Sequence, residues 1–178
     1  ASGGSKPGGP ILIYWPALID SKHIKEKIHF AGKETEVIPT SQLDLDEVYY
    51  QKTKVDIPPA PKGKTTLKPL GLVFGARSGD KGGCANLGLW AKTSKAYSFL
   101  SEFLTTSKLK ELLPDLNEFE IDRYELPNIL SLNFYIHGIL EDGVSSNSRK
   151  DGQAKSLGEY IRAKKVEMPI EIMENKVE

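Results

Sequence analysis

A short glycine-rich stretch carries the residues of this chain that are best suited to chemistry. Residues 76–88 read Ala-Arg-Ser-Gly-Asp-Lys-Gly-Gly-Cys-Ala-Asn-Leu-Gly and lie between two apolar runs. Glycine adopts positive φ without a steric penalty, so main-chain N–H groups can converge on one point. The stretch therefore predicts a tight loop between two strands that binds a carboxylate or a phosphate, with Arg77 and Lys81 adding two cations. The predicted ligand-binding residues are Arg77, Ser78, Gly79, Gly82, Asn86 and Asn133.

A second interpretation of the same stretch needs no ligand. Glycine-rich hairpins are common, and their glycines can serve the geometry of the turn alone. In that case Asp80 accepts hydrogen bonds from main-chain N–H groups of the turn, and Lys81 lies in water. The residues fit both interpretations.

Three residues are candidate catalytic groups, namely Asp80, Lys81 and His137. With an anion held by the two cations, Asp80 would orient one of them or accept a proton. His137 follows an apolar run, and histidine can act as a general base near neutral pH. Asn133 and His137 would share one side of a strand, because alternate residues of a strand face the same way. The alternative for His137 is a purely structural hydrogen bond to the main chain.

Composition excludes several function classes. The chain of 178 residues has 24 basic and 24 acidic side chains, so it lacks the basic excess of nucleic-acid-binding proteins. Its single cysteine, Cys84, excludes an intrachain disulfide and a zinc site of several cysteines. The three histidines show no ligand spacing, so we expect no metal and no resident cofactor. No apolar run approaches the roughly 20 residues of a membrane span, so we expect no membrane partner. The balanced charge predicts no nucleic-acid partner, and the single cysteine predicts an intracellular protein.

Proline and glycine divide the chain into three segments. In residues 1–38, the sequence predicts strands at 11–15 and 33–38 and a short helix over 21–28. Residues 39–68 form a proline-rich connector, because a cluster of prolines cannot join the interior of a sheet. Residues 69–178 form the largest segment.

This largest segment shows a regular succession of strands and helices. Alternating apolar and polar residues predict strands, and apolar residues three or four positions apart predict helices. Helices on one face of a mainly antiparallel sheet make an α+β two-layer sandwich of ferredoxin-like kind. The predicted strands are 69–76, 85–92, 119–126, 130–136 and 165–169, and the predicted helices are 96–104, 105–113 and 151–163.

Two motifs in this segment resemble one protein family. The first is Ala-Arg-Ser-Gly-Asp-Lys-Gly at 76–82 with Asn-Leu-Gly at 86–88. The second is Asp-Arg-Tyr-Glu-Leu-Pro-Asn at 122–128, followed farther on by Asp-x-Gln-x-Lys-x-Leu-Gly at 151–158. In order and spacing they resemble the C-terminal ferredoxin-like domain of the acyclic terpene utilisation protein A (AtuA) family. More weakly, the beginning of the chain resembles the end of the family's larger N-terminal domain.

The resemblance implies a role in the metabolism of branched-chain or terpenoid acids and their acyl-CoA thioesters. It is compatible with part of a hydratase, a lyase or a hydrolase, with acyl-CoA as the ligand of the glycine-rich stretch. The alternative is a non-catalytic domain that dimerises or docks the N-terminal domain. The chain departs from the family pattern at Gly83, where an acidic residue is usual, and at Cys84, 141–142 and Ala154. Because Gly83 occupies this position, the chain lacks any function that the acidic side chain has in the family.

The resemblance also implies partners. Residues 1–38 would be the terminal segment of the N-terminal domain, so we expect an N-terminal AtuA-like chain or domain to pair with them after cleavage in the glycine-rich beginning. We also expect a homo-oligomer. The expected location is the cytoplasm, with the mitochondrial matrix as the alternative.

Overall fold

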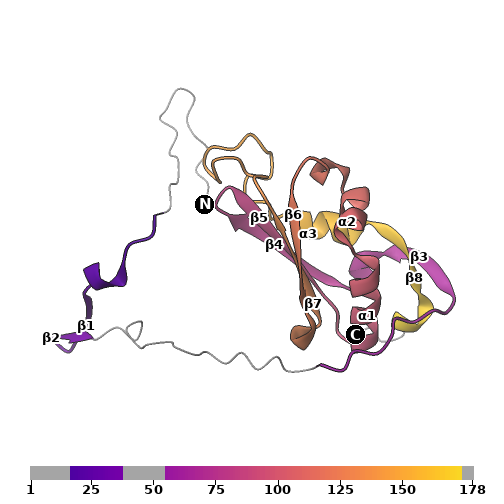
Figure 1. Cartoon of the computed structure of the whole chain (residues 1–178), viewed down its shortest axis with the longest axis horizontal. Helices are drawn as coiled ribbons and strands as arrows, with labels where there is room; N and C mark the ends of the chain where they lie inside the picture. Colours follow the sequence, from indigo (N-terminus) through magenta and orange to yellow (C-terminus); the bar gives the residue numbers. More distant parts are fainter. Residues whose placement is uncertain (1–16, 38–54, 174–178) are drawn as a thin grey trace. The chain divides into compact units, whose positions relative to one another are not determined.

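The computed structural model describes residues 17–37 and 55–173, which belong to two separate units (Figure 1). Each unit is described by itself. The strand predicted at 11–15 lies outside the described residues. Within the described parts, no helix is long and apolar enough to cross a membrane.

The smaller unit is a β-hairpin with highly exposed side chains. A 3-10 turn at Ser21–His23 leads to β1 (Glu26–Phe30), which pairs antiparallel with β2 (Lys33–Val37). The strand predicted at 33–38 is confirmed over 33–37, but the helix predicted over 21–28 is wrong. Polar and apolar residues alternate along β1, which favours a strand. Ile28 and Phe30 are 55% and 79% exposed, so this two-stranded sheet has no core of its own.

The larger unit contains two antiparallel sheets. The main sheet has the strand order β4-β5-β7-β6, and β3 pairs with β8 in a second, two-stranded sheet. The helices pack together with the main sheet around one hydrophobic core. In chain order the elements are β3 (Thr65–Pro69), β4 (Gly75–Lys81), β5 (Cys84–Trp90), α1 (Ser94–Phe103), α2 (Thr106–Leu112), β6 (Ile121–Leu126), β7 (Ser131–Ile136), α3 (Leu157–Ala163) and β8 (Lys165–Pro169).

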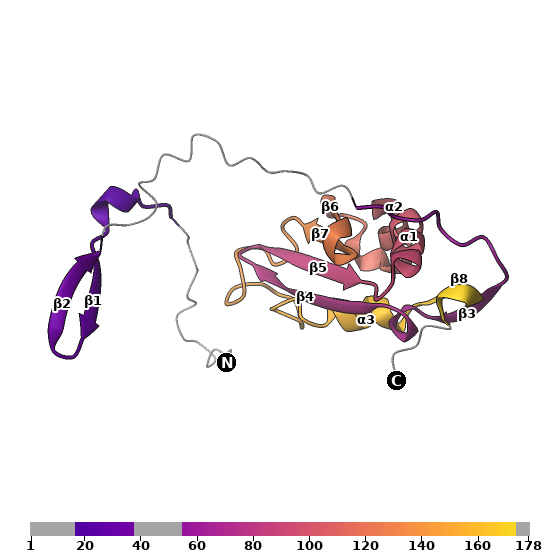
Figure 2. The same cartoon turned by 90° about the horizontal axis from the view of Figure 1, so that it is seen from below.

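The main sheet has one buried face and one open face. Leu87 of β5 and Phe134 of β7 are fully buried, whereas their strand neighbours are only half-buried. Leu100 of α1, Leu109 of α2 and Ile161 of α3 belong to the same core as these sheet residues, so the helices cover the same face (Figures 1 and 2). The predicted α+β sandwich with helices on one face is confirmed.

Hydroxyl side chains begin the first two helices. Thr93 accepts a hydrogen bond from the Ala96 N–H at 3.2 Å, and Thr105 accepts one from the Lys108 N–H at 3.1 Å. Each bond satisfies one main-chain donor that lacks a partner within the first helical turn. Helix α2 thus starts within one residue of the predicted position, whereas α1 starts at Ser94, two residues before the predicted start at 96.

The glycine-rich stretch is a strand over most of its length. The predicted strand at 69–76 is wrong, because Pro69 ends β3, a 3-10 turn follows at Leu70–Leu72, and β4 begins only at Gly75. Gly75 is required there, since a Cβ atom would lie 2.2 Å from the indole ring of Trp90. The predicted tight loop shrinks to Gly82 and Gly83, which connect β4 to β5.

Two other boundaries also differ from the prediction. Residues 65–69 lie in the predicted connector but form β3, because a proline is tolerated at the end of a strand. Helix α3 begins at Leu157 and not at Asp151, because the chain first makes turns in which Ala154 has φ of +52°. Such a left-handed conformation cannot continue a right-handed helix.

Candidate functional site

β4 lies at the edge of the main sheet, and one side of its main chain has no strand beside it. The two-residue turn makes Lys81 and Cys84 a hydrogen-bonded pair, so the odd-numbered residues of β4 bond to β5. The N–H and C=O groups of Ala76, Ser78 and Asp80 therefore point away from β5. The first motif thus presents main-chain donors and acceptors along a free edge.

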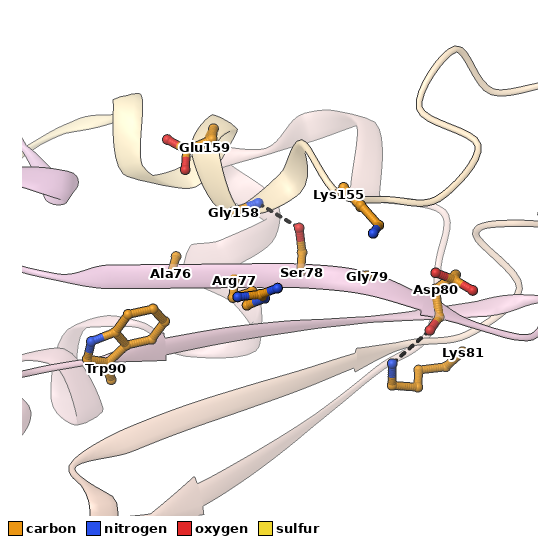
Figure 3. A pocket seen from close by; sticks show the side chains of 10 residues that line it. All are labelled: Ala76, Arg77, Ser78, Gly79, Asp80, Lys81, Trp90, Lys155, Gly158 and Glu159. Carbon is orange, nitrogen blue, oxygen red and sulfur yellow. Dashed lines mark hydrogen bonds between the residues drawn. The ribbon is translucent and has the colours of Figure 1, made fainter. Parts of the chain in front are cut away.

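A groove of about 490 Å³ follows this edge (Figure 3). One wall is β4 itself, and the other comes from the segment that leads into α3. The groove is lined by Ala76, Arg77, Ser78, Gly79, Asp80, Lys81, Trp90, Lys155, Gly158 and Glu159. Residues 76–81 belong to the first motif of the resemblance, and residues 155–158 belong to its last stretch. Both parts therefore line the same groove.

The groove contains three basic side chains. Arg77 and Lys81 are exposed on β4, and Lys155 precedes α3. The Lys81 Nζ atom donates a 2.7 Å hydrogen bond to the main-chain oxygen of Asp80, which holds this cation at the free edge. The carboxylates of Asp80 and Glu159 also line the groove, so three cations face two anions.

Ser78 joins the two walls of the groove. Its hydroxyl accepts a 2.9 Å hydrogen bond from the Gly158 N–H at the start of α3. Gly158 permits this approach, because a Cβ atom there would lie 3.3 Å from the Arg77 Cα atom. The side chain of the predicted ligand-binding residue Ser78 thus has a structural role as an acceptor, while its hydroxyl hydrogen and its main chain remain available to a ligand.

Asp151 fixes the segment that carries Lys155. Its carboxylate accepts hydrogen bonds from the N–H groups of Lys155, at 3.0 Å, and Ser156, at 2.8 Å, and from the Ser156 hydroxyl at 2.6 Å. Partial burial opposes ionisation, but the hydrogen bonds from Ser156 and Lys155 outweigh it and lower the pKa of Asp151. The ionised carboxylate therefore positions one cation of the groove.

We expect Asp151→Asn to remove part of the acid sensitivity of the fold. A pKa that folding lowers contributes stability above the ordinary value of about 3.9, and this contribution disappears as the pH falls through the folded-state pKa. Urea unfolding should show the variant less stable than wild type at about pH 6, with the difference shrinking at about pH 3. Asp142→Asn, at an exposed position, is the control. A wild-type-to-variant difference that stays constant with pH would contradict this assignment.

The other predicted residues lie on the open face of the sheet. Asn86, Asn133, Tyr135 and His137 share this face, as the strand register requires. The Asn86 Nδ2 atom donates to the Asn133 Oδ1 atom at 3.4 Å. These residues are neighbours of the Arg77 position across the sheet, since Arg77 pairs with Gly88 and Gly88 with Asn133. None of the four lines the groove.

His137 has a partner that the sequence did not reveal. Its Nε2 atom lies 2.8 Å from the Asp122 Oδ2 atom, and the Tyr124 hydroxyl donates to the same oxygen at 3.4 Å. The Tyr135 ring packs edge-on against the imidazole, with centroids 4.9 Å apart. A hydrogen bond with Cys84, followed by burial, raises the pKa of Tyr135. Asp122 could have been found from strand alternation, because it faces the same side of β6 as Tyr135 does on β7.

The groove is lined by five of the predicted site residues, namely Arg77, Ser78, Gly79, Asp80 and Lys81. Gly82 is a turn residue with φ of +64°, and no atom lies within 4 Å of the position that a Cβ atom would take there, so its role is conformational. Lys155, Trp90 and Glu159 also line the groove, although the sequence did not predict them as site residues.

Comparisons with known proteins agree with this architecture. Residues 69–167, more than half of the chain, match the family model described as the AtuA ferredoxin-like domain. No curated protein and no solved structure matches the chain.

Proposed function

Because the chain belongs to the AtuA ferredoxin-like domain family, we propose that residues 69–167 bind an anionic ligand in the groove along β4. The ligand would be a branched-chain or terpenoid acid or its acyl-CoA thioester, and the chain would be part of an enzyme that acts on it. One observation carries this proposal: Arg77, Lys81 and Lys155 surround a strand edge with free main-chain donors.

The arrangement suits an anion for two reasons. Cationic side chains form charge-assisted hydrogen bonds with carboxylate and phosphate oxygens, which are stronger than neutral ones. The free N–H groups of the edge can add further donors without any change in the sheet. The excess of one positive charge over the two carboxylates favours a ligand with several negative charges.

The groove also offers groups for chemistry. Asp80 provides a carboxylate that would act as a general base, and Lys81 provides a cation that would polarise a carbonyl oxygen. These roles fit a hydratase, a lyase or a hydrolase. The pair of His137 and Asp122 is a second acid–base candidate, which would act on a ligand that extends across the open face.

The test is calorimetric titration of the chain with CoA and short branched acyl-CoAs. Arg77→Ala combined with Lys81→Ala should weaken binding about 100-fold, because each charged hydrogen bond contributes about 1.5 kcal/mol or more. Lys68→Ala combined with Lys165→Ala removes the same charge from exposed positions outside the groove and should change affinity less than about threefold. Equal heats in the two double variants, or none in wild type, would refute the proposal.

Exposed apolar side chains favour a second function, docking. Ile28 and Phe30 of the hairpin, and Trp90, Tyr124 and Leu126 at one end of the open face, are at least 40% exposed. An N-terminal AtuA-like chain or domain, or a second copy, would cover such surfaces. Light scattering after size exclusion would detect a dimer, and a mass equal to one chain at all concentrations would exclude self-association.

A further inference from the structure

The two ends of the groove along β4 are lined by different side chains. At one end, the indole of Trp90, which is 40% exposed, packs over Gly75. Toward the other end, Lys155 and the carboxylate of Asp80 lie on one side of β4, and Lys81 lies on the opposite side (Figure 3). The groove thus has Trp90, Arg77 and Glu159 toward one end and two lysines with Asp80 toward the other, with exposed main chain between them.

The middle of the groove offers a specific set of main-chain groups. The Asp80 oxygen already accepts the hydrogen bond from Lys81, and the Ser78 hydroxyl is used by Gly158. The N–H groups of Ser78 and Asp80 and the C=O groups of Ala76 and Ser78 have no main-chain partner within the described residues. Four such groups on one strand edge match an extended ligand that carries amides of its own.

We propose, building on the anion site above, that the groove selects an acyl-CoA thioester over a free acid by pairing β4 with the pantetheine arm. This arm is extended and holds two secondary amides separated by two methylene groups. Its amides would bond to the main chain of Ser78 and to the Asp80 N–H, as an added strand does. The phosphates would lie at Lys81 and Lys155, and the acyl group would lie toward Trp90.

The length of the groove favours this ligand class. Seven residues of β4 extend over roughly 20 Å, since each strand residue advances about 3.3 Å. A free branched acid needs only two or three donors around its carboxylate and would leave most of the edge unpaired. A CoA thioester places its anionic groups and its apolar acyl group at opposite ends of a polar arm. The groove places the indole of Trp90, the free strand edge and the two lysines in the same order, with Arg77 and Glu159 beside the edge.

Three probes separate the parts of the ligand: CoA, 3′,5′-ADP, which lacks the arm and one of the three phosphates, and isovalerate, a free branched acid. Calorimetry should show CoA binding at least tenfold more tightly than either of the others, because one net hydrogen bond contributes about 1 kcal/mol and two amides can pair. Amide hydrogen exchange at Ser78 and Asp80 should slow at least tenfold with CoA and remain unchanged with 3′,5′-ADP.

Two variants at one position isolate the main-chain contact. Ser78→Ala keeps the edge N–H and loses only the bond to Gly158, whereas Ser78→Pro also removes the N–H, which an edge strand tolerates. We expect Ser78→Pro to bind CoA about tenfold more weakly than Ser78→Ala, with equal affinity for 3′,5′-ADP. The exchange measurement on wild type decides the question even if Ser78→Pro does not fold.

The outcomes distinguish the two proposals. If CoA and 3′,5′-ADP bind equally well, require Arg77 and Lys81, and leave exchange at Ser78 and Asp80 unchanged, pantetheine pairing is overturned while the anion site stands. Tight binding of isovalerate without binding of CoA would likewise overturn pantetheine pairing and leave the anion site in place. If no probe binds, both proposals fail.

Discussion

Replacing Gly83 with alanine should lower the free energy of unfolding by about 2–3 kcal/mol, the cost typical of forcing an extra carbon into packed structure. A Cβ atom at position 83 would lie 2.2 Å from the main-chain oxygen of Glu141. The loop that carries this oxygen cannot move easily, because Ile139 and Leu140 are buried and the Leu140 N–H bonds to the Gly83 oxygen at 2.9 Å. Urea unfolding followed by circular dichroism measures the change.

The neighbouring glycine is the matched control. Gly82 has φ of +64°, and no atom lies within 4 Å of its Cβ position, so Gly82→Ala introduces strain without a collision. We expect it to cost about 1 kcal/mol. If Gly83→Ala proves no more destabilising than Gly82→Ala, the close packing of the turn against the loop is incorrect. This packing also accounts for the family departure at Gly83, since an acidic side chain would not fit beside Glu141 here.

Replacing Arg123 with methionine should also cost about 2–3 kcal/mol, since charged hydrogen bonds to two main-chain oxygens are lost together. The Arg123 Nε atom donates to the Leu104 oxygen at 3.0 Å, and the Nη2 atom donates to the Ser101 oxygen at 2.7 Å. These oxygens end helix α1, where a cation also interacts favourably with the helix dipole. Methionine retains an apolar chain but leaves both oxygens without this donor. Thermal and urea unfolding both report the loss.

Glu125→Gln tests whether the ion pair alone explains the effect. Arg123 also bonds to Glu125, with Nη1 and Oε1 atoms 2.6 Å apart. The substitution leaves the bonds to α1 in place, so we expect a loss below about 1 kcal/mol. If the two variants are equally unstable, Arg123 has no capping role.

The sequence predicts the buried parts of the fold well. β5, β7 and the first two helices follow from alternation and apolar periodicity, because burial of one face requires apolar residues at regular intervals in the sequence. The prediction fails where a segment is exposed, or where residues distant in the sequence determine the local structure. The alternation along β1 covers only a few residues that no core buries, so the sequence favours a helix over 21–28 there, and β4 contains glycines that local rules assign to a loop. Gly75 belongs in a strand because the Trp90 side chain of the next strand packs over it, and a local rule cannot include this contact.

The candidate site is predictable in part. Arg77, Asp80 and Lys81 were named from the motif, and the structure places all three in the groove. Lys155 lies far away in the chain, so only the fold could add it, although it lies in the second stretch of the resemblance. Asn86, Asn133 and His137 do share a face as strand alternation predicts, but none of the three lines the groove. Strand alternation shows which residues share a face of the sheet, but it does not show which of the two faces the helices cover.

Titration of isotope-labelled chain with CoA, followed by amide NMR, tests the central claim that the two motif segments form one anion site. The amide signals of residues 76–81 and 155–159 should shift together and saturate with one affinity, and Arg77→Ala combined with Lys81→Ala should abolish the shifts. Shifts confined to Asn86, Asn133 and Tyr135 on the open face, or no shifts at millimolar CoA, would contradict the claim.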